Sequence, residues 1–430
     1  MNLLKKIPTR LKYNPLRDTK KKGIALLMAM TSLILMIYIA SEVSKDSTIE
    51  YVVNSQEINR IKAYYAARNS MDVALLRIKI YQQVAGMQLP PGFAQEIDQL
   101  WKFPFGWPLP ITAAMSSSAK ESSEETSKEA LFEGQYDHII SDEGSKIDIN
   151  DLASPSEVLR TTTAKQLLNI FEQQLESNDE FRDQYQNFNF TELINRITDW
   201  MTDTQDNQSK NGGDKRGPFQ SLGSEDYPPN RGFRTLDELR LIPGMTDEFY
   251  TLLAPQITIY GMKAINPNLA HAKVLKSLDK GINDESIKEV LERRDDPDKG
   301  GPFKGAGSDE CRNDFKNFIL SHGARLESEF DKIPFSCDKV LNFRIQATGR
   351  SGSGKGAVQK KLTAIVININ RMASQLKSYV DKEKKEAQSQ QQAASAELPP
   401  PAAKTGPTSG AQIKEPLPKG RPRIVYWSEI

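Results

Sequence analysis

An uncharged apolar run near the start of the chain constrains its fold more than any other feature. The run extends from Ile24 to Ala40, and as an α-helix it would span about 25 Å, enough to cross the hydrocarbon core of a membrane. Lysines and arginines precede it, with Asp18 as the sole acid, which keeps this end of the chain in the cytoplasm. The run therefore predicts a membrane anchor or the core of a signal peptide, with the rest of the chain exported.

The residues that follow favour a retained anchor that continues as one long helix. No proline or glycine occurs between Ile24 and Ala85, and no small-residue cleavage site of the secretory type follows the run. Beyond the membrane, apolar residues recur at helical spacing and predict an apolar face: Ile58, Ile61, Tyr64, Tyr65, Met71, Leu75 and Ile78. An ordinary signal-anchored protein with an amphipathic stalk also fits this pattern.

Composition narrows the chemistry of the exported part. Lys+Arg 57 against Asp+Glu 56 gives a net charge of +1, so no overall field attracts nucleic acid or another polyanion. The two cysteines exclude a four-cysteine zinc site, and the three histidines, His138, His271 and His322, argue against a His-rich metal centre. No nucleophile with a neighbouring base can be assembled, so the sequence predicts that the chain is not an enzyme.

The junction Lys21-Lys22-Gly23-Ile24 resembles the signal of type IV prepilins, in which a basic leader and one glycine precede a long apolar helix. The resemblance implies that a prepilin peptidase cuts after Gly23 and that the mature chain begins at an N-methylated Ile24. The helix would then serve as a membrane anchor and later as part of a filament core. Such proteins usually have glutamate as the fifth residue after the cut, whereas this chain has Met28.

That departure is typical of general secretion pathway protein K, the large minor pseudopilin of type II secretion, which the chain also resembles in several internal tracts. The most specific tract runs from Asn230 to Gly261 and is followed by Ala264 to Leu278. The resemblance implies a subunit at the tip of the secretion pseudopilus that initiates its assembly and supports protein secretion across the outer membrane. Its implied partners are other minor pseudopilins, the prepilin peptidase and the inner-membrane secretion platform. It would be a single-pass inner-membrane protein with most of the chain in the periplasm.

The remaining patterns predict an α+β fold. Gln135 to Ile140 with Ser145 to Asn150, and Asn342 to Gly349 with Lys361 to Asn370, are predicted as two hairpins on either side of short amphipathic helices. This order indicates one sheet domain interrupted by a helical insertion. The resemblance implies the matching architecture: a long N-terminal membrane/pilin helix and an antiparallel pilin-like sheet with a large inserted all-α domain. The predicted segments are the leader (1–23), the long helix (24–86, of which 24–40 spans the membrane), the first part of the pilin-like domain (87–149), the inserted helical domain (150–335), the second part of the sheet (336–375) and a disordered Pro/Gln/Ala-rich tail (376–430).

Two polar stretches are predicted to lack a fixed structure. Thr112 to Ala130 is rich in serine and glutamate and is predicted as a mobile loop within the sheet domain. The tail has too few apolar residues to form a core of its own. It ends in an apolar patch, Ile424 to Ile430, of the kind that adds as a strand to the sheet edge of a partner.

Two acidic segments form the best candidate for a chemical site. In the family that the chain resembles, this region binds calcium. Calcium takes six to eight oxygen ligands, and clustered carboxylates on loops supply them. The candidate ligands are Asp199, Asp203, Asp206, Glu225 and Asp226. Asp199, Glu225 and Asp226 match the family pattern, whereas Thr202 and Thr204 stand where the family has acids. In place of the two missing acids, the site would use Asp203, Asp206 or backbone carbonyls, or would have fewer ligands. The alternative to a calcium site is a solvated acidic loop.

A second pattern suggests a different function. Leu239 to Met245 and Ile265 to Arg294 resemble helix-hairpin-helix units, whose glycine-containing turns offer backbone amides to a DNA phosphate. The alternative function is therefore a membrane-anchored DNA receptor. The lysines of the second segment, Lys276 and Lys280, have acids beside them, and no basic stripe accompanies the turns, so no nucleic acid partner is expected.

The two cysteines lie where the inserted domain returns to the sheet. If Cys311 and Cys337 are exported to an oxidising compartment, they can form one disulfide that closes a loop of about 26 residues. Two free buried thiols are the alternative.

Overall fold

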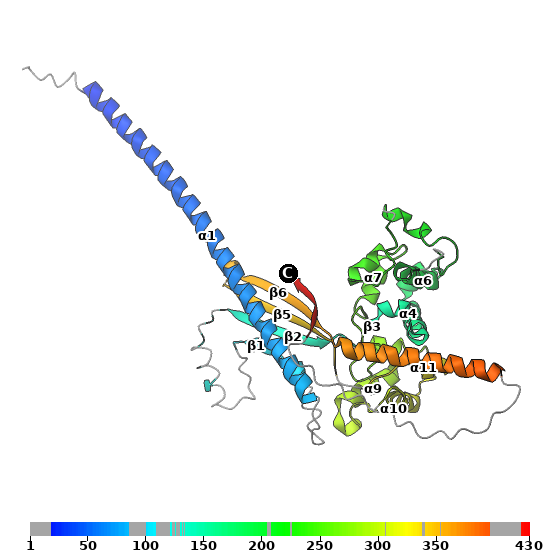
Figure 1. Cartoon of the computed structure of the whole chain (residues 1–430). Coiled ribbons are helices and arrows are strands. Elements are labelled where there is room, and N and C mark those ends of the chain that lie inside the picture. Colours follow the sequence, from blue (N-terminus) through cyan, green and yellow to red (C-terminus); the bar gives the residue numbers. More distant parts are fainter. Residues whose placement is uncertain are drawn as a thin grey trace, which may run out of the picture.

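The computed structural model shows a long helix, a sheet packed on its second half and a separate helical region (Figure 1). The predicted leader up to Asp18, most of the predicted Ser/Glu-rich loop and residues 396–422 of the predicted tail lie outside the residues that it describes. The described residues are 19–85, 100–108, 121–122, 125, 130, 132, 134–203, 208–223, 226–305, 307–337, 340–352, 354–395 and 423–430.

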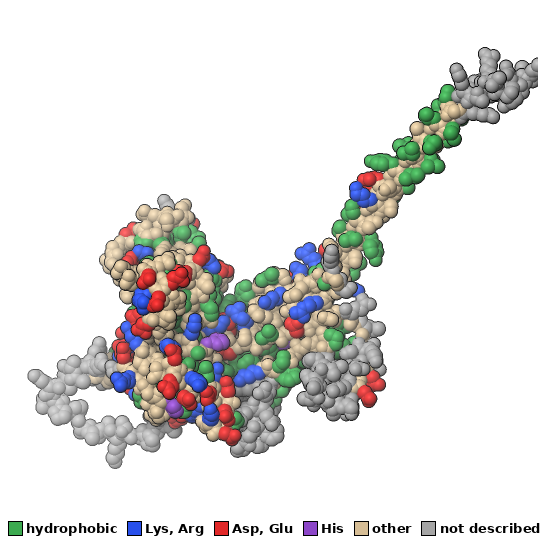
Figure 2. All heavy atoms as spheres, turned by 180° about the vertical axis from the view of Figure 1, so that it is seen from behind, with side chains coloured by type: hydrophobic (Ala, Val, Ile, Leu, Met, Phe, Trp, Pro, Cys, Tyr) green, Lys and Arg blue, Asp and Glu red, His purple; other side chains and the backbone are tan. Residues whose placement is uncertain are grey.

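Helix α1 (Thr19–Ala85) contains 67 residues and projects far beyond the rest of the protein (Figure 1). Its most apolar window has a mean hydropathy of 2.3 and is 0% buried, and α1 is the one helix of the described residues that could cross a membrane by length and composition. Residues 23–54 are all exposed, and Figure 2 shows apolar side chains along this projecting half. Because the apolar half is not buried by any described part of the chain, it does not serve as a core helix.

The sheet has five antiparallel strands in the order β1-β2-β5-β6-β7. Strands β2 and β5 pair along their full length, from Gln135 opposite Arg350 to Asp142 opposite Phe343. The chain leaves the sheet after β2 and returns at β5, so the helical region is an insertion between two neighbouring strands. The strands are β1 (Phe105–Trp107), β2 (Gln135–Asp142), β5 (Phe343–Ser351), β6 (Val358–Val366) and β7 (Ile424–Glu429).

Helix α1 approaches the sheet closely because its inner face is made of small residues. This face consists of fully buried Ala63, Ala66, Ala67, Ser70 and Ala74. It packs on Gly349 of β5, where a Cβ atom would lie 2.1 Å from the carbonyl oxygen of Ala63 and 2.2 Å from the amide nitrogen of Ala67. Tyr81, Trp101 and Phe343 close the far end with edge-to-face ring contacts at 5.7–6.4 Å.

Only part of the apolar face that the sequence predicts for α1 is therefore buried against the sheet. Met71 and Ile78 are fully buried, as expected, but Ile58, Ile61 and Tyr65 are 49–58% exposed. Alanines take the contact positions in this part of α1, since a larger side chain would hold the helix away from the sheet. The outer apolar residues remain available on the surface.

A histidine lies at the helix-sheet interface in a fixed neutral form. The His138 ring is 2% exposed, its Nε2 accepts a hydrogen bond from Arg77 Nη1 (2.8 Å), and its Nδ1 lies 3.1 Å from Ser70 Oγ. Because a guanidinium can only donate, Nε2 must carry no proton and Nδ1 donates to the serine. Burial first, and then the charge of Arg77, lower the pKa of His138 from the usual 6.5 to about 4.

The lowered pKa of His138 predicts that the protein becomes less stable to unfolding in mild acid. Between pH 6.5 and about 4 the unfolded chain binds a proton at His138 that the folded chain does not, so the free energy of unfolding falls as the pH falls through this window. The expected loss is about 2 kcal/mol. Denaturant unfolding of the wild-type protein and of His138→Gln across this range measures it, and the difference in stability between the two proteins must change with pH. Parallel profiles would contradict the fixed neutral ring.

The inserted region is almost entirely helical and has one continuous core. Serine, asparagine and threonine cap its main helices, as when the side chains of Ser156, Asn189 and Asn283 accept from the amide three residues ahead. Phe171, Phe181, Phe190 and Phe249 pack ring against ring at its centre. Its elements are β3 (Ile147–Asp148), η1 (Ile149–Ala153), α4 (Glu157–Ser177), α5 (Asp179–Tyr185), α6 (Phe190–Met201), η2 (Gly217–Leu222), η3 (Leu236–Leu241), α7 (Asp247–Leu253), β4 (Ile257–Thr258), α8 (Ala272–Lys276), α9 (Asp284–Asp295), η4 (Pro297–Lys299), α10 (Ser308–Ser321) and η5 (Ser328–Lys332).

Of the two predicted hairpins, the first is wrong. Residues 145–150 do not pair with β2; instead, Ile147 and Asp148 form β3, which pairs in parallel with β4 inside the inserted region. The turn after β2 is held by the Asp142 carboxylate, which accepts hydrogen bonds from the amides of Gly144 (3.2 Å) and Ser145 (2.8 Å) and turns the chain away. The second predicted hairpin is present as β5 and β6, joined by a turn that includes η6 (Gly354–Gly356).

The tail is more ordered than the prediction of disorder from residue 376 allows. Residues Ile369–Ser395 form helix α11, and the Glu383 side chain caps the start of α4 by accepting from Ser156 Oγ (2.6 Å) and from the amides of Glu157 (3.1 Å) and Val158 (3.0 Å). Low hydrophobicity did not preclude a helix, because alanine, glutamine, glutamate and lysine are strong helix formers. The terminal apolar patch forms β7 on the chain's own β6 rather than on a partner.

Candidate functional site

The predicted cleavage junction lies in the exposed first part of α1. Gly23 is helical, and a Cβ atom there would meet nothing within 4 Å. A glycine inside a helix costs about 1 kcal/mol relative to alanine, so the fold itself gives no reason for this residue. Ile24 and Met28 are 58% and 64% exposed, and the Met28 carbonyl accepts hydrogen bonds from the hydroxyls of Thr31 and Ser32.

The acidic candidates divide into a buried residue, exposed residues and residues outside the described part of the chain. Asp199 is 2% exposed in the last turn of α6, and Asp203 and Asp226 are exposed. Asp206 and Glu225 lie outside the described residues. The Asp199 carboxylate accepts from Ser209 Oγ (2.5 Å) and from the Lys210 amide (3.1 Å), which fixes the loop that follows α6.

The same loop places a lysine among the predicted ligands. Lys215 is 1% exposed, and its Nζ donates to the carbonyl oxygen of Thr202 and to Asn230 Oδ1 (2.7 Å). We call these three residues, with Asp199 and Asp203, the Lys215 site. Burial lowers the pKa of Lys215, and the carboxylates of Asp199 and Asp203 partly oppose that shift. Lys215 lies between the two acidic segments, in a polar loop whose composition does not distinguish a buried lysine from an exposed one.

The described residues of this site do not by themselves form a calcium site. Among the residues that the structure describes, no three His, Cys, Asp or Glu side chains lie close enough together to hold a metal. A backbone carbonyl and an asparagine oxygen, which are typical calcium ligands, already bind the Lys215 ammonium. Calcium binding therefore stays an untested prediction of the resemblance.

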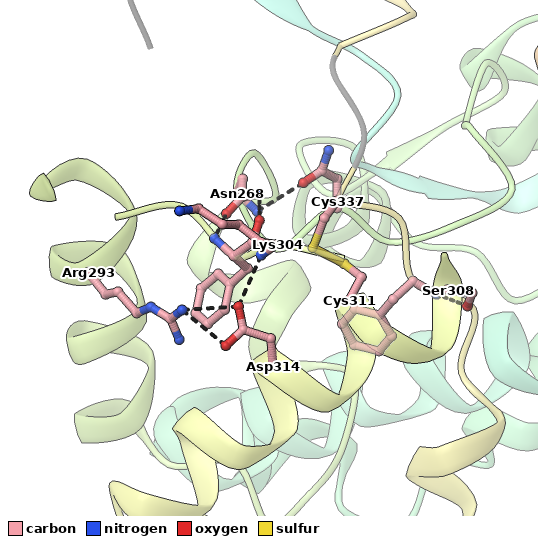
Figure 3. The surroundings of a disulfide bond; sticks show 10 residues. Asn268, Arg293, Lys304, Ser308, Cys311, Asp314 and Cys337 are labelled. Atoms are coloured by element: carbon pink, nitrogen blue, oxygen red, sulfur yellow. Dashed lines mark hydrogen bonds and ion pairs between the residues drawn. A yellow bond between two sulfur atoms is a disulfide. The ribbon is translucent and has the colours of Figure 1, made fainter. Parts of the chain in front are cut away.

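Cys311 and Cys337 are joined by a disulfide at the end of the inserted region, with their Cα atoms 5.5 Å apart (Figure 3). The bond links the first turn of α10 to the segment that leads back to β5. Nearby, Arg293 forms two hydrogen bonds of 3.0 Å with the Asp314 carboxylate, and its guanidinium lies 4.1 Å from the centre of the Phe303 ring. The disulfide thus fixes the exit from the inserted region.

The second helix-hairpin-helix-like segment, Ile265 to Arg294, is a packing unit. A Cβ atom on Gly281 would lie 1.5 Å from the carbonyl oxygen of Arg325, whose amide donates to the Gly281 carbonyl (2.9 Å). The turn therefore needs glycine in order to contact its own chain. Lys276 Nζ pairs with Asp284 and Lys280 Nζ with Glu172, each at 2.6 Å, so neither lysine presents an unopposed charge to a phosphate. The geometry lends no support to the DNA-receptor alternative.

Comparison with known proteins finds a family match within the inserted region. Residues 145–262, which include the Lys215 site, match the family model of type II secretion system protein K. A chain in the crystal structure of the GspK-GspI-GspJ complex from the enterotoxigenic Escherichia coli type 2 secretion system is 15% identical, with 74% of this chain and 95% of that chain covered and a TM-score of 0.48. No curated protein matches the sequence. Over residues 145–262 the match is to the family expected from the sequence, that of type II secretion system protein K.

Proposed function

We propose that this minor pseudopilin forms the tip of the type II secretion pseudopilus, initiates its assembly and so supports protein secretion across the outer membrane. The observation that carries the proposal is the family match within the inserted region. That region is attached between two neighbouring strands of the sheet, at the end of the molecule away from the exposed half of α1 (Figure 1). A body of this size above the helix leaves no room for a further subunit to stack on top.

The exposed half of α1 supplies the anchor and the assembly surface. Before assembly it spans the inner membrane, with the inserted region in the periplasm, and the secretion platform extracts it. A prepilin peptidase removes the leader after Gly23, and Ile24 becomes the methylated first residue. Two observations support this processing: the glycine has no structural role in α1, and the junction itself is exposed.

The partners are other minor pseudopilins, which contact the exposed apolar residues of α1. The similar solved chain comes from a complex named for GspI and GspJ. Co-purification of the full-length chain with the other minor pseudopilins of its own secretion system tests the proposal. The affinity tag belongs at the C-terminus, where Ile430 is 76% exposed, since an N-terminal tag would be lost with the leader. A complex that contains the minor pseudopilins is expected; isolation without any pseudopilin would contradict the tip role.

Met28→Glu tests why the fifth residue of the mature chain is apolar. The side chain is 64% exposed, so folding and leader removal should proceed as in the wild-type protein. A carboxylate at this position would let the subunit neutralise the amino terminus of a neighbour and enter the filament below the tip, so secretion should fall. Met28→Leu is the matched control and should secrete normally. Normal secretion by Met28→Glu, measured in a strain that lacks the chromosomal copy, would contradict this role of Met28.

A further inference from the structure

A lysine side chain occupies the middle of the region where the family resemblance predicts calcium. Lys215 lies between the end of α6, through the Thr202 carbonyl, and the segment that contains Asn230. These are the two parts of the chain that a calcium ion would have to bring together. The ammonium is 1% exposed and therefore depends on the oxygen atoms around it to replace its hydration.

Two carboxylates act on the charge of the lysine and partly oppose the effect of burial on its pKa. Asp199 and Asp203 are the carboxylates whose charge acts on Lys215. Asp199 is buried close to the C-terminus of α6, where the helix dipole disfavours a negative charge, so a cation beside it is stabilising. The same cation binds the Thr202 carbonyl, which the end of the helix leaves without an intrahelical partner.

The loop that carries Lys215 is held in place by several other contacts. Besides its contacts with Asp199, it closes on itself through the bridge between Gln208 and Asp214. Asn211 then ties it to α6 by accepting from Asn195 Nδ2 (2.8 Å) and donating to the Glu192 carbonyl (3.1 Å). An ordered loop therefore holds the Lys215 side chain in the site.

We propose that the Lys215 ammonium is the resident cation of the Lys215 site and that it occupies the Thr202 and Asn230 oxygens in place of calcium. A metal ion bound to the same oxygens would lie next to the ammonium, and the two positive charges would repel each other. This inference goes beyond the tip role and does not depend on it.

Thermal unfolding of the full-length protein in detergent, with calcium or with a chelator, tests the proposal. Calcium at a hundred times its dissociation constant would raise the melting temperature of a region of this size by about 5–10 °C. We expect a shift below about 1 °C for the wild-type protein, and no heat of binding when calcium is titrated into it. A calcium-dependent rise of several degrees would overturn the proposal, whatever the behaviour of the variants.

Lys215→Met tests the lysine itself, because methionine keeps the length of the side chain and removes the charge. We expect the melting temperature to fall by several degrees, since Asp199 and the Thr202 carbonyl lose their cation. Lys210→Met is the matched control: it lies in the same loop with an exposed side chain and should melt as the wild-type protein does. If Lys215→Met melts like Lys210→Met, the lysine is not the resident cation. If Lys215→Met does not fold, the calcium titration of the wild-type protein still decides.

Discussion

Gly349→Ala is expected to loosen helix α1 from the sheet and to lower the free energy of unfolding by about 3 kcal/mol. A single methyl group there would lie 2.1–2.2 Å from backbone atoms of Ala63 and Ala67. Backbone atoms cannot rotate away as a flexible side chain can, so the helix has to move. This shift would disturb the buried face from Ala63 to Ala74 that joins the helix to the sheet.

The matched control is Gly356→Ala in the turn between β5 and β6. A Cβ atom at Gly356 would meet nothing within 4 Å, and the residue does not have a positive φ. This variant should lie within about 1 kcal/mol of the wild-type protein, since an added methyl group mainly restricts the unfolded chain. Denaturant unfolding of both variants in detergent measures the difference. Equal stability of Gly349→Ala and the wild-type protein would contradict the close contact between α1 and β5.

Loss of the disulfide is the second large effect. The double variant Cys311→Ser/Cys337→Ser opens a link between residues 26 apart in sequence and should cost about 3 kcal/mol through the greater freedom of the unfolded chain. The effect should centre on the inserted region, because the bond joins α10 to the segment that returns to β5.

Unfolding of the wild-type protein and the double variant, each with and without reductant, measures this contribution. Reductant should lower the stability of the wild-type protein to that of the variant and leave the variant unchanged. Labelling of the denatured, unreduced wild-type protein should find no free thiol. Two labelled thiols in protein isolated from the cell envelope would contradict the bond.

The sequence predicted the fold class because its strongest signals are local. The apolar run, the absence of helix breakers up to Ala85 and the two β-rich segments on either side of helical periodicity yield a long helix, a sheet and an insertion, and the structure confirms this class. The family match over residues 145–262 agrees with the prediction of a structural pseudopilin rather than an enzyme.

Local sequence patterns do not show which distant segments pair with each other in the sheet. Strand β2 pairs with β5 across about two hundred residues, and nothing in Gln135–Asp142 identifies a partner that far away, so the nearer segment at Ser145 was chosen wrongly. Helix α11 was missed for a related reason: Glu383 caps a helix that begins at Glu157, and only the fold brings the two together.

The acidic site could be predicted only in part from the sequence. The clustered carboxylates include Asp199 and Asp203, and the resemblance implies that they bind calcium. In the structure the side chain that binds the Thr202 carbonyl beside them is Lys215, which comes from a loop rich in glycine and lysine. A buried lysine is rare without an acidic partner, but burial cannot be read from a loop of this composition.

The mass of the N-terminus, measured on protein from the cell envelope with and without the prepilin peptidase, tests the pseudopilin assignment most directly. A pseudopilin should begin at Ile24 and carry the added mass of one methyl group, and it should do so only in cells that contain the peptidase. An intact leader in both strains, or a chain cut after Ala40, would contradict processing at Gly23 and with it assembly through the pilin pathway.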